Sequence, residues 1–243
     1  MMAIVIFDVK STLFERGTPL KVTKAKAAEN RAALVQAAGS LFRERGIDGV
    51  GVAEISKRAG LTHGALYAQF PSKEALAAEA FAAAFKRGFE RMTADRDGRP
   101  ATLTDYLDYY LSFDHRDNVA TSCAMSACVS EVARQDKVLC DRVTEGFEQL
   151  VALMERGLGA SPVKAENRQR AVAMAAAMIG GLAASRAVAK TDPKLSNEIL
   201  RALRRIVGEV GGEAGQVDGA RRRARATRKR ARGLRAAVRT QLS

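Results

Sequence analysis

The stretch GIDGVGVAEISKRAGLTHGALYAQFPSKEAL, residues 46–76, decides the fold of this chain. It holds two short helical patterns separated by a tight turn at residues 59–61, and their apolar faces point at each other. These apolar residues are Val52, Ile55, Ala59, Leu66 and Phe70. Helices shorter than about ten residues are not stable alone, so both must pack on a longer neighbour.

The second short pattern leaves one helix face directed outward. Its outward side chains are Thr62, His63, Ala65, Tyr67 and Gln69. A helix face of this size fits the major groove of a DNA duplex, where each base pair presents a distinguishable set of donors and acceptors. The pattern therefore indicates a helix-turn-helix that reads DNA.

Longer helices are predicted on both sides of this pair. One runs from about Lys26 to Arg45, with a periodic apolar stripe at Leu34, Ala38, Leu41 and Phe42. The other begins at Ser72, and Glu74 lies in its first turn, where negative charge suits the helix dipole. Its apolar stripe continues well past the pair, so this helix is expected to connect the N-terminal domain to the rest of the chain.

In this order the segments resemble the DNA-binding end of the TetR family of one-component bacterial transcriptional regulators. The resemblance rests on a joint pattern, because a bare helix-turn-helix match is weak. Its pieces are the helix at 33–42, VAEIS at 52–56, AGLT at 59–62, GALY at 64–67 and FPSKEAL at 70–76. The chain departs from the family pattern at Gly51, where Ser or Thr is common, at Ala65, where a hydroxyl residue is common, and at His63, where Lys is common.

The resemblance implies which residues contact DNA. They are Thr62, His63, Gly64, Ala65, Tyr67, Gln69 and Lys73. Thr62 is also explained as a helix cap alone, and Tyr67 as a half-buried core residue. By the resemblance, Tyr67 instead reaches the DNA backbone. Lys73 opens a helix, where a cation opposes the helix dipole, so a phosphate partner explains it better than stability does.

Composition favours an all-α protein with a polyanionic partner. The chain has 243 residues, no Trp and a formal net charge of +13, and its one alternating strand-like run is at residues 3–7. Residues 211–243 contribute a net +8 from ten basic and two acidic residues. Such a tail would add salt-dependent affinity for any DNA sequence, or it is a disordered tail without a selected role.

The predicted organisation has five parts. They are a flexible leader at 1–24, the helix-turn-helix domain at 25–71, a connecting helix at 72–98, a ligand-binding and dimerisation domain at 99–210, and a basic disordered tail at 211–243. Helices of the second domain are expected at 102–113, 118–134, 136–158, about 162–190 and 195–210. The leader is a solvated arm or a basic arm that contacts DNA.

The resemblance implies that the second domain binds a small molecule and that the last two helices form a four-helix bundle in a homodimer. Small residues there allow close packing, within one subunit or between two: Gly180, Gly181, Ala183, Ala184 and Ala187. The expected ligand is mostly hydrophobic. The residues expected to line its pocket are Tyr106, Tyr110, Phe113, Phe147, Met154 and Met174.

Other residues point to no cofactor, metal or membrane partner. The chain has three Cys and two His without metal-ligand spacing, which favours a reduced cytoplasmic protein. The uncharged run at 171–184 is too short to span a bilayer. Cys123, Cys128 and Cys140 pack as small hydrophobes or sense electrophiles, and packing is favoured. His115 is expected in a loop at a helix end, with a pocket mouth as the alternative.

The sequence thus predicts a homodimeric repressor that a small molecule releases from a near-palindromic operator. One alternative is a non-specific nucleic-acid-binding protein driven by the arginine-rich tail. An enzyme has little support, because the chain shows no paired carboxylate motif, no glycine-rich phosphate loop and no Cys–His arrangement of recognisable spacing.

Overall fold

The fold is all-helical, as the sequence predicts. A computed structural model describes residues 23–158 and 164–211, and within these ranges the named elements are α-helices and one short 3-10 helix, with no strand. Residues 1–22 of the predicted leader, residues 212–243 of the predicted tail, and the predicted helix start at Ser161 and Pro162 lie outside the described residues, and with them the strand-like run at 3–7.

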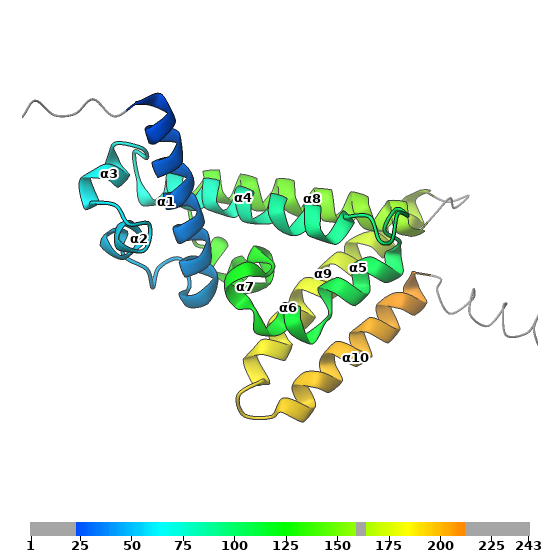
Figure 1. Cartoon of the computed structure of the whole chain (residues 1–243). Helices are drawn as coiled ribbons and strands as arrows, with labels where there is room; N and C mark the ends of the chain where they lie inside the picture. The colour runs from blue at the N-terminus through cyan, green and yellow to red at the C-terminus, as the bar shows by residue number, and fades with distance from the viewer. Residues whose placement is uncertain (1–22, 159–163, 212–243) are drawn as a thin grey trace, which may run out of the picture.

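Three helices form the N-terminal domain (Figure 1): α1 (Lys24–Arg45), α2 (Val52–Arg58) and α3 (His63–Tyr67). The predicted apolar faces meet, since Ile55, Leu66 and Phe70 are buried against the stripe of α1. This packing stabilises the two short helices, which would unfold in isolation. The long helix α1 is therefore the scaffold on which the pair is held.

Helix α4 (Lys73–Thr93) packs on both the N-terminal helices and the helices that follow it. It begins at Ser72, whose side chain caps it by accepting the N–H of Ala75 at 3.1 Å. Its first half packs on α1, and it then runs alongside α8 (Lys137–Leu158) (Figure 1). A movement of α4 in the second domain would therefore shift the helix-turn-helix.

The next elements are shorter than the periodicity predicts. The expected helix at 102–113 is α5 (Leu103–Tyr110) followed by α6 (Phe113–Asp117), because Ser112 accepts the N–H of His115 at 3.0 Å and starts a new helix. The expected helix at 118–134 is a 3-10 helix, η1 (Val119–Thr121), followed by α7 (Ala124–Val132). Apolar spacing predicted the helices but not these breaks, of which the first depends on the Ser112 side chain and the second has no side-chain cap.

The last two helices are antiparallel neighbours: α9 (Lys164–Val188) and α10 (Pro193–Val210). By length and composition alone, the part of α9 from Glu166 to Val188 could cross a membrane. The uncharged run at 171–184 is too short to span a bilayer, but the longer helix that contains it is long enough. In the fold α9 lies against α8 and α10, and it buries Met174, Met178 and Leu182. Its apolar residues are thus used in packing within the domain.

A clamp of polar contacts fixes the end of α1 to the second domain. The Arg43 guanidinium is buried and donates to the carbonyl oxygen of Ala120 in η1, with a distance of 2.8 Å from Nε. The Glu131 carboxylate in α7 accepts the N–H of Ile47 at 2.6 Å. Gly46 has φ +81°, and a Cβ built there would lie 2.6 Å from Glu131 Oε1, so only glycine fits. These contacts are called the α1 clamp below.

Candidate functional site

The outward face of α3 is arranged as the sequence predicts. Leu66 is fully buried, whereas Thr62, His63 and Gly64 are exposed and Tyr67 has 53% of its surface exposed. Ala65 and Gln69 are partly exposed. The Tyr67 ring meets the His63 ring edge-on, with centroids 5.2 Å apart. An aromatic side chain this exposed contributes little to the core, so the structure favours the outward interpretation of Tyr67 over the buried one.

Local capping sets where α3 begins. Thr62 Oγ1 accepts the N–H of Ala65 at 3.3 Å, which satisfies one of the free donors at the helix start. Gly60, with φ +70°, turns the chain between α2 and α3. Gly51 caps α2 without a side-chain hydrogen bond, as expected for glycine. The remaining free N–H groups at the start of α3 point to solvent and are available to an anion.

Arg31 of α1 holds the far end of α3 and was missed by the sequence analysis. Its guanidinium lies 4.1 Å above the Phe70 ring and donates to the Gln69 carbonyl oxygen at 2.6 Å. Its Nε also donates to Glu79 of α4 at 3.1 Å. Arg31 therefore ties α1, α3 and α4 together. Its signal in the sequence is weak, because an arginine on an outer helix face usually points to solvent.

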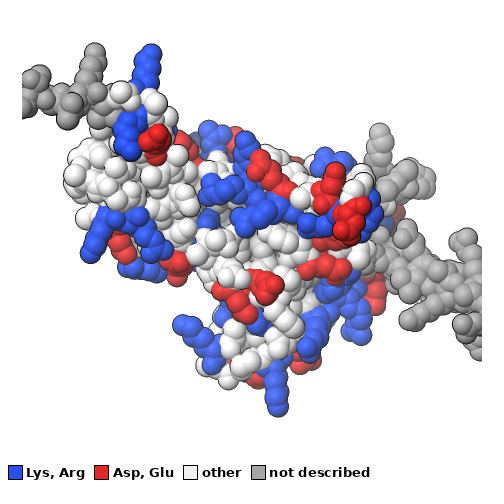
Figure 2. All heavy atoms as spheres, in the orientation of Figure 1, with Lys and Arg blue, Asp and Glu red and all other residues white. Residues whose placement is uncertain are grey.

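Lys73, the first residue of α4, is half-exposed beside the α3 face. Figure 2 shows Lys and Arg side chains flanking a mostly uncharged tip at the helix-turn-helix end of the molecule. Two basic residues at the end of α2, Lys57 and Arg58, are exposed, and Arg58 lies 3.7 Å from Glu44. A neutral reading face with cations around it matches how proteins divide base contacts from phosphate contacts.

Residues 34–80, which contain this site, match the family model for bacterial regulatory proteins of the tetR family. This match identifies a DNA-binding segment of the TetR type in the chain. Over 54 residues the chain is 44% identical to the HTH-type transcriptional repressor BepR of Brucella suis biovar 1 (strain 1330). That match covers 22% of this chain and 26% of BepR, so the chain spans about a quarter of the length of the curated relative that it matches.

Solved structures extend the similarity in fold to the second domain. The reduced form of E. coli NemR has a TM-score of 0.60 at 21% identity, covering 74% of this chain and 96% of NemR. A putative TetR-family regulator from Rhodococcus sp. has a TM-score of 0.56 at 21% identity, covering 72% of this chain and 97% of that one. At such identities the likeness concerns the fold alone.

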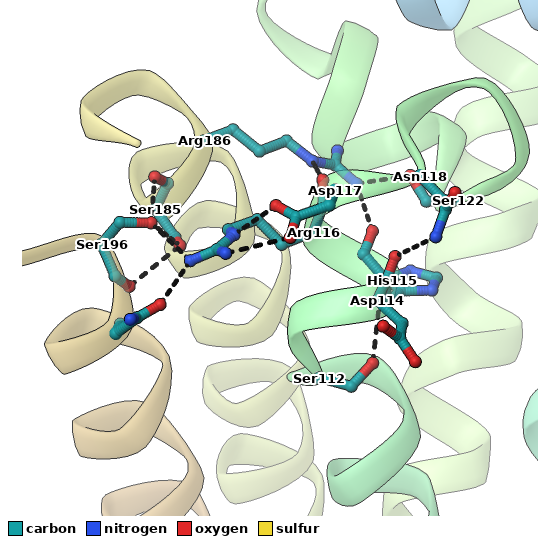
Figure 3. A network of polar contacts seen from close by, with 11 residues as sticks. Ser112, Asp114, His115, Arg116, Asp117, Asn118, Ser122, Ser185, Arg186 and Ser196 are labelled. Carbon is teal, nitrogen blue, oxygen red and sulfur yellow. Dashed lines mark hydrogen bonds and ion pairs between the residues drawn. The ribbon is translucent and has the colours of Figure 1, made fainter. Parts of the chain in front are cut away.

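A polar network lies in the second domain (Figure 3). Its centre is Arg186 of α9, which donates to the carbonyl oxygens of Arg116 at 2.9 Å and His115 at 2.8 Å. It also donates to the hydroxyl oxygens of Ser122 and of Ser126, the latter at 2.9 Å. All four acceptors are neutral. Burial lowers the pKa of Arg186 from its ordinary value, and nearby Cys123 opposes this shift.

A second arginine links the same segment to α10. Arg116 Nη1 donates to Ser196 Oγ at 2.9 Å and to Asn197 Oδ1 at 2.7 Å (Figure 3). Ser196 and Ser185 are fully buried and bonded to each other, which joins α9 to α10. The short helix α6 is thus held by both C-terminal helices. Arg186 has one signal in the sequence, since it follows Met178 and Leu182 at helical spacing and so lies on the inner side of α9.

His115 is not the loop residue that was expected. It lies in α6 with 7% of its surface exposed, and its ring centroid is 5.0 Å from those of both Tyr109 and Tyr110. Its Nε2 accepts the N–H of Cys123 at 3.3 Å. The Ser112 cap explains the difference, because it places His115 inside a helix instead of after one. His115 lines two adjoining cavities, in keeping with the pocket interpretation.

The predicted ligand-binding residues do not lie around one cavity. Tyr110 lines an inner cavity between α4, α5, α7 and α8. Phe113 instead lines an open groove of about 520 Å³ between α6 and α10. Met154 and Met174 are buried in the core, and Tyr106 and Phe147 pack against it. Periodicity identified these side chains as inward-facing, but it does not say which inward-facing residues border an empty space.

The cysteines are free thiols in three different settings. Cys128 is buried, its Sγ lies 3.5 Å from the Phe42 carbonyl oxygen, and burial raises the pKa of its thiol to about 12. Cys140 is partly buried near the start of α8. Cys123 is partly buried and lines the inner cavity. The packing interpretation therefore suits Cys128 best, because a protonated buried thiol is a poor nucleophile.

Acid is expected to destabilise the protein through His115. Burial, with Arg186 and Arg91 nearby, lowers the pKa of His115 from 6.5 to about 4 in the folded state. The unfolded chain therefore binds a proton first, and stability is complete above about pH 6.5 and falls progressively toward pH 4. The loss should reach about 2–3 kcal/mol. Urea denaturation between pH 7 and pH 4.5 checks this.

The variant His115→Gln provides the comparison, since its amide oxygen can still accept the N–H of Cys123. Its free energy of unfolding should change much less than that of the wild type over the same pH range. Equal pH dependence in the two proteins would show that other groups cause the acid sensitivity.

Proposed function

We propose that the chain is a homodimeric transcriptional repressor that a small molecule releases from a near-palindromic DNA operator. The observation that carries this proposal is the exposed face of α3 on a helix-turn-helix that matches the TetR family model. The relative with 44% identity over this region is described as a repressor. The protein acts in the cytoplasm, where its DNA is.

In this proposal α3 enters the major groove and its neighbours hold the DNA backbone. Tyr67 and Lys73 contact phosphates, and Thr62 presents its hydroxyl and the free N–H groups at the start of α3. The remaining residues of the proposed reading face are His63, Gly64, Ala65 and Gln69. A glutamine there can pair with adenine, and the alanine can contact a thymine methyl group.

The proposed dimer is supported by an apolar face that α9 and α10 leave exposed in the single chain. On α10, Leu195 and Ile206 are large apolar residues with much of their surface exposed, and Ala202 lies between them on the same face. On α9, Val172 and Gly180 are exposed. If the same face of a second subunit packed symmetrically against it, both faces would be buried. The two copies of α3 would then lie on one side of the dimer.

The proposed release mechanism uses two connections between the domains. Helix α4 belongs to both, and the α1 clamp adds a second link from η1 and α7 to the end of α1. A ligand that favours one arrangement of α4 and α7 shifts the population toward dimers whose recognition helices no longer match the groove spacing. The α1 clamp thus offers a second route beside the one through α4.

The alternative, a non-specific nucleic-acid-binding protein, depends on residues 211–243, which lie outside the described part. A test compares the full-length protein with a variant ending at Val210. Fluorescence anisotropy measures the binding of each to DNA from beside its own gene and to a scrambled duplex at physiological salt. We expect the shortened protein to keep its preference for its own DNA. Equal binding to both duplexes that disappears with the tail would support the alternative.

Replacing Tyr67 with alanine should weaken operator binding by about tenfold or more, since it removes a phosphate contact and apolar contact from the reading face. Phe113→Ala is the matched control, because Phe113 is also an exposed aromatic residue but lies in α6. Both variants should unfold like the wild type. Operator affinity that is unchanged in Tyr67→Ala would remove Tyr67 from the interface.

A further inference from the structure

Two adjoining cavities lie beside α6, and they differ in chemistry. The inner one is enclosed, has a volume of about 30 Å³ and is lined mostly by apolar side chains. These include Phe85, Phe89, Met92, Tyr110, Cys123 and Leu150. The outer one is open to solvent, has a volume of about 240 Å³ and is lined by polar residues, among them Arg91 and Asp114. His115 and Tyr109 border both, so the two spaces meet at these rings.

In the wall of the inner cavity, one buried hydrogen-bonding group lacks a partner. The Tyr110 hydroxyl is the buried side-chain polar atom without a hydrogen bond in the described part of the chain, and 3% of Tyr110 is exposed. Burial, with Cys123 nearby, raises the pKa of Tyr110, and Arg186 and Ser126 oppose this rise without reversing it, so the hydroxyl stays protonated and can donate. Buried polar groups in native proteins are nearly always paired, and an exception needs an explanation. A bound acceptor would provide one.

The surrounding charge favours an anionic acceptor. Arg91 donates to the backbone carbonyl oxygens of Arg87 and Thr121, each at 3.2 Å, and pairs with no carboxylate among the described residues. Arg186, behind His115, likewise bonds only to neutral oxygens. Asp114 is the one acid in the described lining of the outer cavity. The charges that act most on His115 are nevertheless those of Arg186 and Arg91.

We infer that these two cavities form one effector site for a small amphipathic carboxylate. Its apolar body enters the inner cavity, and its carboxylate lies where the cavities meet, near the Tyr110 hydroxyl and Arg91. The inference rests on the proposed function, and it names the class of ligand for that function. A charged head and an apolar body match the two linings, since an apolar group gains by leaving water and a carboxylate needs donors.

The inner cavity is too small for an apolar ligand body unless its wall moves. About 30 Å³ holds one or two water molecules, whereas a cavity that binds benzene measures about 150 Å³. An apolar body can therefore enter only if the wall formed by Phe85, Phe89 and Met92 moves. All three are on α4, which continues into the contact with α1. Binding of this ligand thus displaces the helix that both domains share.

The test uses matched acid and amide probes on the full-length protein. The probes are 3-phenylpropionate, 4-phenylbutyrate and octanoate, each paired with its primary amide, and isothermal titration calorimetry measures binding. We expect at least one acid to bind with a dissociation constant below about 1 mM and about tenfold more tightly than its amide. Amides that bind as tightly as the acids, or acids that do not bind at all, would overturn the inference.

Two variants locate the binding. Arg91→Gln should abolish the preference for acid over amide, whereas Arg87→Gln, one turn earlier on α4 and outside the described lining of both cavities, should retain it. Tyr110→Phe should bind the acid several-fold more weakly but should be at least as stable as the wild type without ligand, because it removes an unpaired buried hydroxyl. Acid binding unchanged in both Arg91→Gln and Tyr110→Phe would place the site elsewhere and contradict the inference.

Operator binding without ligand, measured in parallel, keeps this inference separate from the proposed function. If the protein prefers its operator but does not bind the acids, the proposed function stands and this ligand class is wrong. If the protein binds the acids but shows no operator preference, the site stands and the proposed function as a repressor is wrong.

Discussion

Replacing Arg186 with methionine is expected to lower the free energy of unfolding by about 2–4 kcal/mol. Methionine fills a similar apolar volume but donates no hydrogen bond. The carbonyl oxygens of His115 and Arg116 would then lose their guanidinium partner, as would the hydroxyls of Ser122 and Ser126. A buried acceptor left unpaired costs more than a normal hydrogen bond contributes.

Urea denaturation at fixed protein concentration measures this effect, because the stability of a dimer depends on concentration. Arg142→Met is the control, since Arg142 is exposed and pairs with Glu145 on the surface of α8. Surface ion pairs contribute about 0–1 kcal/mol. If Arg186→Met lost no more stability than Arg142→Met, the network around α6 would not stabilise the fold.

Replacing Ile206 with glutamate is expected to separate the proposed dimer and to weaken operator binding by on the order of 100-fold. Ile206 is 47% exposed in the single chain and lies in the C-terminal part of the apolar face of α10. Two glutamates facing each other across a symmetric interface would be desolvated and would repel one another. A separated subunit binds one half-site and loses the gain from engaging both.

Sedimentation equilibrium measures the mass of the variant, and fluorescence anisotropy its operator affinity. Val138→Glu is the control, because Val138 is about equally exposed but lies on α8, away from the α9 and α10 face. It should remain a dimer with normal operator affinity. A dimeric Ile206→Glu protein that binds DNA normally would show that the interface is elsewhere.

Most of the fold was predictable because helices are encoded by local spacing. The stripe of α1 and the facing apolar residues of α2 and α3 were read from the sequence and are confirmed by burial of Leu34, Ile55 and Leu66. The two breaks that divide the segments at 102–113 and 118–134 were missed. A side-chain cap such as Ser112 acts through one hydrogen bond, which leaves the apolar period almost unchanged.

The exposed face of α3 was predictable from the helical spacing, whereas its contacts with DNA stay a prediction that rests on the resemblance to a family pattern. The cavities and the network were not predictable, since both depend on residues far apart in the chain. Arg186 and Ser122 are 64 residues apart, and Arg43 and Ala120 are 77 apart. Apolar spacing distinguishes inside from outside, but it cannot say which inner residues touch or which leave a space between them.

The α1 clamp also bears on how such proteins can be recombined. A chimera that joins the helix-turn-helix of this chain to the second domain of a relative would separate Arg43 and Gly46 from Ala120 and Glu131. The Arg43 guanidinium would then depend on the position of a foreign backbone carbonyl, and the N–H of Ile47 would lose its acceptor wherever the relative lacks the Glu131 carboxylate. The two domains, divided by their order in the chain, are therefore not units that can be exchanged independently. A working graft of the DNA-binding end has to bring η1 and α7 with it.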